Sequence, residues 1–274
     1  MRITHSWMLI VAVLLAAVAG AAPAQEPPQR DLLLTQPGWE IGGQISSYHY
    51  EEPGIMKLEG ERTSFVGAYT HTNPSRVYWR FDLRLSYGLL EYESVGTGTI
   101  ADVPDWISEV RAVIGRDYLV SEGVALSPYI GFGYRYLYND LTGYSTTGAV
   151  GYERYSHYFY VPIGVTLRFR AAERWVVAPT VEYDWFLTGR QVSKLSDVGC
   201  GYSDANNKQS DGRGYRANLM FETGRWTFGP WLHYWKIRDS DTVFVGFDCF
   251  GRATLATEPE NWTREYGFEL RYRF

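Results

Sequence analysis

The 274-residue sequence predicts an all-β fold, a transmembrane antiparallel up-and-down β-barrel of about ten strands. Apolar and polar residues alternate with period two along most segments, as in strands whose two faces meet different surroundings. Hydrophobic residues make up 45% and aromatic residues 16% of the chain, yet no run after the N-terminus reaches the ~20 apolar residues of a membrane helix. Tight turns also alternate with long polar connections, which predicts short periplasmic turns and long extracellular loops.

The N-terminal segment has the composition of a secretory signal peptide. Arg2 supplies a positive charge, residues 7–19 form an apolar core, and Ala22-Pro23-Ala24 offers small residues for cleavage. We therefore divide the chain into a signal peptide, a periplasmic lead and the barrel, at residues 1–24, 25–37 and 38–274. The formal net charge of -5 argues against a nucleic-acid partner.

Residues 77–87 show the alternation most clearly. Trp79 and Phe81 fall on one face, and Arg80 and Arg84 fall on the other. Facing an arginine to lipid costs roughly 2–4 kcal/mol at the bilayer midplane, so a slip of this strand by one residue is strongly disfavoured. The same alternation predicts ten strands, at residues 38–50, 62–71, 77–87, 105–118, 127–139, 155–170, 174–191, 213–223, 225–237 and 261–274.

The last predicted strand, residues 261–274, carries aromatic residues on one face and both signs of charge on the other. Its ending resembles the C-terminal assembly signal of bacterial outer-membrane β-barrel proteins. The family's glycine, alternating hydrophobic residues and terminal aromatic residue correspond to Gly267, Leu270, Tyr272 and Phe274. The resemblance implies that the outer-membrane assembly machinery inserts the chain. That machinery and outer-membrane lipid are the expected partners, and the outer membrane is the expected location.

Charged residues on the inward faces predict a wet lumen. They are Arg80, Asp82, Arg84, Glu109, Arg111 and Arg168. Three prolines, Pro128, Pro179 and Pro230, begin three upward strands and set the relative heights of these strands. On these heights one inward cluster is expected, formed by Glu182, Asp184, Arg216, Glu222 and His233. Arg190 is expected on the same inward face.

Two interpretations of this cluster remain open. Carboxylates beside an arginine and a histidine can bind a ligand or carry out acid–base chemistry. Alternatively, the cluster is a salt-bridge network that fills a narrow barrel, because buried charges must be paired. An eight-stranded barrel is nearly filled by its own side chains, so ten strands leave at most a narrow pore.

The two cysteines, Cys200 and Cys249, lie in the fourth and fifth long connections. A disulfide is expected between them because secreted chains meet an oxidising compartment. In the chain-entropy model it contributes roughly 4 kcal/mol. The spacing does not suit a metal site, since no Cys or His lies nearby, and no cofactor is expected.

The expected function is non-enzymatic, either through extracellular loops that bind a ligand or through a narrow lumen that passes a small solute. The alternative is a hydrolase, because the strand count resembles the omptins, ten-stranded outer-membrane proteases. Asp102 and Asp105 loosely match one omptin aspartate pair, with one residue too many between them. The fourth loop contains aspartates but no histidine, so the omptin catalytic base is missing.

Overall fold

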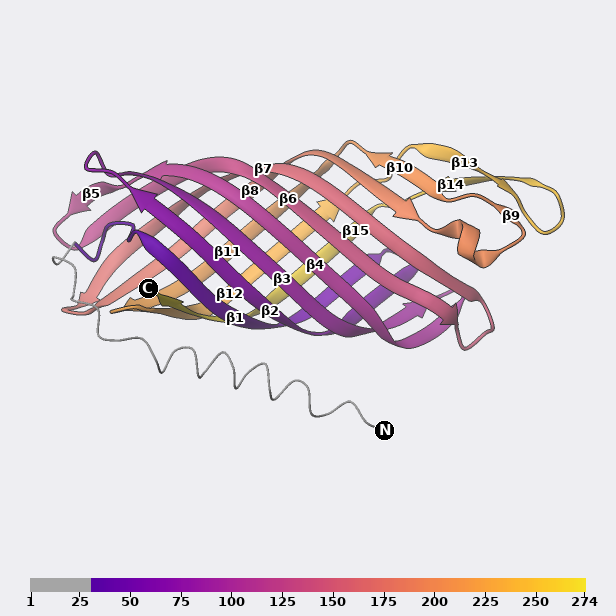
Figure 1. The fold of residues 1–274 in the computed structure, drawn as a ribbon, viewed down its shortest axis with the longest axis horizontal. Helices are drawn as coiled ribbons and strands as arrows, with labels where there is room; N and C mark the ends of the chain where they lie inside the picture. The colour runs from indigo at the N-terminus through magenta and orange to yellow at the C-terminus, as the bar shows by residue number, and fades with distance from the viewer. Residues whose placement is uncertain (1–30) are drawn as a thin grey trace. The chain divides into compact units, whose positions relative to one another are not determined.

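The computed structural model describes residues 31–274, and the expected signal peptide lies outside the described residues. Ten antiparallel strands form a closed barrel in which each strand pairs with the next and the last pairs with the first (Figure 1). The strands are β1 (Gly38–Glu52), β2 (Met56–Thr72), β3 (Val77–Ser94), β4 (Gly98–Arg116), β6 (Val124–Tyr144), β7 (Val150–Ala172), β8 (Trp175–Ser193), β11 (Gly212–Thr223), β12 (Trp226–Ile237) and β15 (Asn261–Arg273). The predicted fold class is confirmed.

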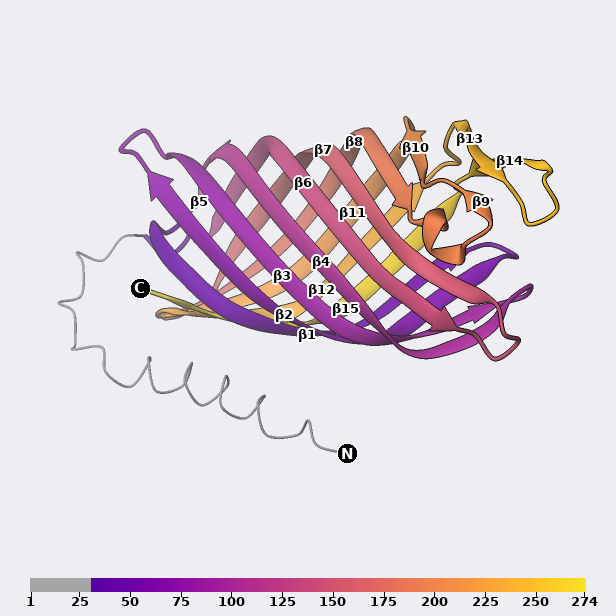
Figure 2. The ribbon, with the colours of Figure 1, turned by 45° about the vertical axis from the view of Figure 1, so that its right-hand side comes forward.

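The two ends of the barrel differ. At one end, here called the turn end, short connections join the strands and both Gly38 and Phe274 are found. At the other end, the loop end, Figure 2 shows a small sheet that extends beyond the barrel. The elements outside the ten-strand ring are β5 (Tyr118–Ser121), the 3-10 helix η1 (Leu195–Val198), β9 (Gly201–Tyr202), β10 (Ala205–Gln209), β13 (Thr242–Phe247) and β14 (Ala253–Thr257). Among residues 31–274, no helix is long and apolar enough to cross a membrane.

The outer face of the barrel is apolar. The inner face is polar in the part of the lumen near the turn end. The predicted register is confirmed on β3, where the Arg84 residue is 5% exposed and Leu85 is 41% exposed. On β15 the outward Phe268 and Leu270 are likewise exposed, while the inward Glu269 is buried. An apolar band that surrounds a lumen with charged walls is the arrangement that a lipid environment selects.

Three hairpins extend further at the loop end than the sequence predicts. Residues 51–61, 94–104 and 140–154 are expected as loops, but most of them continue the ladders of β1–β2, β3–β4 and β6–β7. A strand with water on both faces loses its alternation, so its polar composition imitates a loop. Long connections outside the barrel strands remain only at 194–211 and 238–260 within the described chain.

The prediction for Arg190 is wrong. The pairing of β7 with β8 shifts between Phe159 and Tyr160, where β8 carries one extra residue. Beyond this bulge Gln191 is buried, whereas Arg190 is exposed and contacts Asn206. A bulge reverses the facing of every later residue on its strand, and no feature of the local sequence announces it.

Candidate functional site

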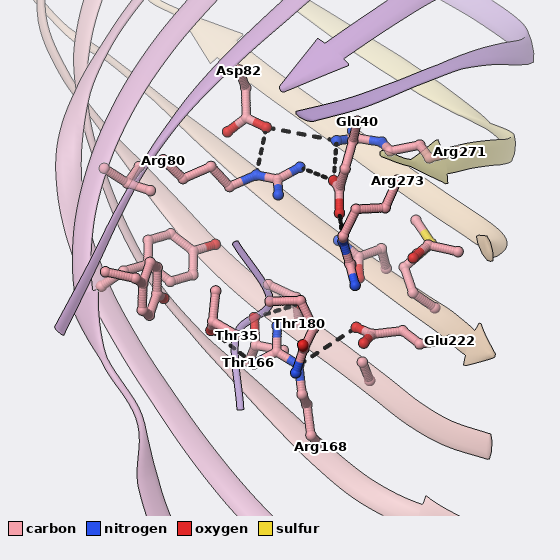
Figure 3. Close-up of a pocket in the computed structure, with 18 of the residues that line it drawn as sticks. Thr35, Glu40, Arg80, Asp82, Thr166, Arg168, Thr180, Glu222, Arg271 and Arg273 are labelled. Atoms are coloured by element: carbon pink, nitrogen blue, oxygen red, sulfur yellow. Dashed lines mark hydrogen bonds and ion pairs between the residues drawn. The ribbon is translucent and has the colours of Figure 1, made fainter. Parts of the chain in front are cut away.

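The turn end of the lumen holds a cavity of about 190 Å³ with charged walls (Figure 3). Glu40 accepts hydrogen bonds from Arg80 and Arg273, each at 2.7 Å, and Arg80 also donates to Asp82 at 2.8 Å. Arg271 lies 3.6 Å from Asp82. The predicted inward facing of Arg80 and Asp82 is therefore present in the structure, and each charge has an opposite partner.

Part of the expected periplasmic lead packs inside this end of the barrel. The Thr35 backbone N–H and hydroxyl both donate to the Asp117 carboxylate at 2.8 Å. Leu33 is buried against Ala125 and Val176. Residues 32–36 thus narrow the turn end, although the sequence shows no pattern there.

A network of five charged side chains lies deeper in the lumen, and we call it the charge network. It consists of Glu109, Arg111, Glu182, Asp184 and Arg216. Arg216 lies 2.7 Å from Asp184, 3.1 Å from Glu182 and 2.5 Å from Glu109, and Arg111 pairs with Glu182. Two tyrosine hydroxyls complete the network by donating hydrogen bonds.

These hydroxyls come from strands on different parts of the wall. Tyr160 donates to Glu109 at 2.8 Å, and Tyr129 donates to Glu182 at 2.6 Å. Three carboxylates are therefore shared between two guanidinium groups and two phenols, and all three carboxylates are buried. Such mutual pairing is the requirement for charges in a confined space.

The structure brings together three of the five predicted cluster residues. Glu182, Asp184 and Arg216 meet, but Glu222 pairs instead with Arg168, at 3.5 Å, near the turn end (Figure 3). Glu222 is six residues beyond Arg216 along the same strand, which corresponds to roughly 20 Å. Sharing an inward face therefore did not place the two residues at one height.

His233 lies beside the charge network without joining it. Its β12 position is opposite Arg216 on β11 and Glu265 on β15. Its ring is 4.5 Å from that of Trp231, and within the described chain its Nδ1 atom has no hydrogen-bond partner. The expected acid–base pairing of His233 with Glu182 or Asp184 is absent from the contacts of the described residues.

Arg84 and Asp105 form separate buried pairs in the lumen. Arg84 contacts Glu265, and Asp105 contacts Arg62 and Asn139. Asp102, by contrast, is exposed, so the two aspartates that loosely match an omptin pair lie in different environments. Within residues 31–274, no group of three or more His, Cys, Asp or Glu side chains is arranged to hold a metal ion.

Towards the loop end the lumen contains a cluster of buried apolar side chains, which we call the lumen plug. It consists of Tyr48, Tyr50, Met56, Leu58, Leu90, Val103, Ile107, Leu137, Leu141, Tyr158, Tyr160, Phe186, Trp235 and Ile237. Leu90, Ile107 and Tyr160 are 0% exposed, and the rings of Tyr160 and Trp235 are 5.0 Å apart. Buried polar groups such as the Arg62–Asp105 pair lie among these apolar side chains, so this half of the lumen is packed instead of lined by charges alone.

Above the lumen plug, a second cavity of about 320 Å³ opens at the loop end, and we call it the mouth cavity. Its floor is formed by Glu52, Arg154 and Glu258. Arg154 lies 2.6 Å from Glu52 and also contacts Glu258, and the Tyr50 hydroxyl donates to Glu52 at 2.8 Å. The sequence prediction missed this floor because it assigned all three residues to loops. The one usable signal was that Glu52 continues the alternation of Tyr48 and Tyr50.

The predicted disulfide is confirmed and lies outside the barrel. Cys200 and Cys249 are bonded, with their Cα atoms 4.8 Å apart. The bond joins the segment that carries η1 and β9 to the turn between β13 and β14. It therefore holds together the two long connections that border the mouth cavity.

The predicted assembly signal lies on β15 beside β1. Leu270 and Phe274 are exposed on the outer face, and a Cβ atom at Gly267 would collide with the Ile45 carbonyl oxygen. The close approach of β1 accounts for this glycine structurally. Recognition of Gly267, Leu270, Tyr272 and Phe274 by the assembly machinery stays a prediction.

Comparisons with known proteins agree with the fold. A family model described as "Outer membrane protein beta-barrel domain" matches residues 10–274. The outer membrane protease OmpT from Escherichia coli has a similar structure, with a TM-score of 0.56 and 12% identity over 89% of this chain and 99% of that chain. At this identity the likeness concerns the fold alone.

Two autotransporter domains are more distant. The β domain of BrkA from Bordetella has a TM-score of 0.40 and 15% identity, over 87% of this chain and 100% of that chain. The translocator domain of NalP from Neisseria meningitidis has a TM-score of 0.40 and 12% identity, over 98% of this chain and 96% of that chain. No curated protein sequence matches the chain.

Proposed function

We propose that this protein binds a ligand without transporting it. The chain belongs to the outer membrane protein β-barrel domain family and is located in the outer membrane. Its apolar outer band faces lipid, as in other membrane-spanning barrels. The loop end faces the outside of the cell and the turn end faces the periplasm, following the usual distribution of loops and turns. The barrel binds a small ligand at its outer end and stays closed to solutes.

The lumen plug is the observation that supports this proposal. The mouth cavity and the turn-end cavity share no lining residue, and the buried apolar side chains of the plug lie between them. A hydrated solute would have to displace a close-packed layer of apolar side chains and the buried ion pair of Arg62 and Asp105 to pass. Of the two expected functions, the lumen plug therefore supports ligand binding at the loop end and argues against a narrow pore.

Planar-bilayer recording tests whether the barrel is closed. The refolded wild-type protein is expected to give no conductance steps. The triple variant Tyr158→Ala, Tyr160→Ala, Trp235→Ala removes three rings of the lumen plug and should give steps if it inserts, which makes it the positive control. Conductance steps from the wild-type protein would contradict the proposal.

An omptin-like hydrolase has weaker support. Asp102 is exposed whereas Asp105 is buried in an ion pair with Arg62, so the two carboxylates do not form one site. A peptide-cleavage assay on the refolded protein separates the two functions. Cleavage that disappears in the variant Asp102→Ala would favour the hydrolase.

A further inference from the structure

We infer that the mouth cavity binds a small organic cation, an apolar body that carries a protonated amine. This ligand class rests on the binding function proposed above and specifies it further. Three observations support the inference: the charge of the floor, the composition of the walls and the closure of the lumen below.

The floor carries one more negative charge than positive charge. Among residues 31–274, Glu52, Arg154 and Glu258 are the only charged residues that line the cavity. They are 4%, 5% and 7% exposed, so water screens their charges poorly. The two carboxylates share one guanidinium, so one negative charge of the floor is not balanced. Since a buried charge is costly unless it is paired, a cation that enters from the open side completes the floor.

The hydrogen bonds of the floor leave room for such a cation. Tyr50 donates to Glu52 and lies 3.5 Å from Glu258, so the phenol is already occupied. The Glu258 backbone N–H donates to Ser240, which anchors the loop that presents the carboxylate. A carboxylate held in this way can accept hydrogen bonds from an ammonium group, which has three donors and no acceptor.

The walls above the floor are mostly apolar. They come from several separate strand ends and connections at the loop end, namely from Ile55, Met56, Ile100, Leu141, Val150, Leu195, Ala256 and Pro259. Tyr92 and Tyr152 add aromatic rings, which attract cations. Apolar walls with a few polar groups at one end are typical of small-molecule sites, and ~300 Å³ is at the small end of their range.

An inorganic cation fits this cavity less well. Divalent ions such as Ca²⁺ take six to eight oxygen ligands, whereas the floor offers two carboxylates that already share an arginine. A bare ion would also leave the apolar walls uncovered. An organic cation uses both features, because its body displaces water from the walls while its charge faces Glu258.

The lumen plug makes the mouth cavity a dead end. Met56 and Leu141 belong both to the plug and to the cavity lining, so the floor of the cavity is continuous with the packed interior. A ligand that enters from outside must leave by the same route. The site is therefore suited to capture at the cell surface.

Calorimetry with three probes of matched shape tests the inference: benzylammonium, benzyl alcohol and benzoate. The refolded full chain in detergent is titrated at pH 8, with empty micelles as the blank. Benzylammonium is expected to bind, benzyl alcohol to bind at least about tenfold more weakly and benzoate not to bind, because only the first probe pairs with the floor.

Two variants separate the charge of the floor from its shape. Glu258→Gln should weaken benzylammonium binding about tenfold or more, because the floor loses its excess negative charge. Glu61→Gln, an exposed position outside the cavity, is the matched control and should leave binding unchanged. Heat-modifiable electrophoretic mobility checks that each variant is folded.

Three results would overturn the inference: equal binding of benzylammonium and benzyl alcohol, tighter binding of benzoate, or no binding of any probe to folded wild-type protein. None of these results depends on the bilayer recording. A silent bilayer together with unbound probes would leave the closed barrel standing and remove only the organic-cation site. Conductance steps would instead contradict the proposed function.

Discussion

In the charge network, every carboxylate depends on a shared guanidinium, whereas in the lumen plug each side chain depends on many weak contacts. Glu109, Glu182 and Asp184 all lie within 3.1 Å of Arg216. In the plug, no single contact dominates, and the rings of Tyr158 and Phe186 meet at 5.7 Å. The comparison shows that the barrel interior is stabilised in two ways: by a few ion pairs with one guanidinium, and by many weak packing contacts between apolar side chains.

The largest expected effect is the loss of the shared guanidinium. Arg216→Met should cost about 3–5 kcal/mol of unfolding free energy, because it leaves buried carboxylates without their cation. Urea unfolding in micelles, followed by tryptophan fluorescence, measures the change. Arg190→Met, on the exposed side of β8, is the control and should change stability by less than about 0.5 kcal/mol. Similar effects at the two sites would mean that the charge network does not hold the lumen.

The charge network also predicts a compensation that the lumen plug lacks. Asp184→Ala should lower the unfolding temperature, and the double variant Asp184→Ala, Arg216→Ala should cost less than the sum of the two single changes, because removal of Arg216 then leaves one buried carboxylate fewer without its cation. A double-mutant cycle measures the coupling. A rise in stability for Asp184→Ala alone would indicate a strained functional site instead of a structural network.

The lumen plug should tolerate a change of shape but not a loss of volume. Leu90→Ala should cost about 2–5 kcal/mol, whereas Leu90→Met should cost less than about 1.5 kcal/mol. The same urea unfolding experiment compares them. If both variants lost the same unfolding free energy, the exact shape of the Leu90 side chain would matter and not only its volume.

The floor of the mouth cavity should make stability depend on pH. Burial raises the pKa of Glu258, in the loop between β14 and β15, to about 7; Arg154 opposes the shift and Glu52 adds to it. Tyr50, Tyr152 and Tyr158 are the other titratable groups facing Glu258. The folded state therefore holds a proton that the unfolded state releases near pH 4.5.

The sign of this pH effect follows from linkage. The extra stability is fully present below pH ~4.5 and is lost as pH rises through about 7, by up to about 3 kcal/mol. Unfolding at pH 5, 6, 7 and 8 measures it, and Glu258→Gln should flatten the profile. If the stability of the wild-type protein rose from pH 5 to pH 8 while that of Glu258→Gln did not, the raised pKa assigned to Glu258 would be contradicted.

The smallest effect is expected where the two regions of the lumen meet. The Tyr160 ring belongs to the lumen plug, while its hydroxyl donates to Glu109 and lies 3.0 Å from Arg216. Tyr160→Phe keeps the ring and removes two hydrogen bonds to charged groups, one donated to Glu109 and one accepted from Arg216, so it should cost at least about 1.5 kcal/mol. Tyr160→Ala should cost several times more in the same unfolding assay. Equal losses would place the whole contribution of Tyr160 in the charge network.

The sequence by itself determined the barrel, its approximate strand count and the facing of most residues. Arg84 points inward and Leu85 outward because the penalty for charge in lipid allows only one register. It also determined the disulfide, since two cysteines in neighbouring loops of a secreted chain have no other partner. These features depend on residues close in sequence or on whether a side chain faces lipid or the lumen, and the sequence of a single chain indicates both.

Only the tertiary structure decided which inward residues meet. Glu222 shares a face with Arg216 but lies at another height, and Glu52, Arg154 and Glu258 converge from strands and loops far apart in sequence. Strand tilt and register stagger determine these heights, and they follow from closure of the whole ring, not from any one strand. For the same reason the apolar plug escaped prediction: alternation distinguishes inside from outside, but what fills the inside depends on what faces it across the barrel.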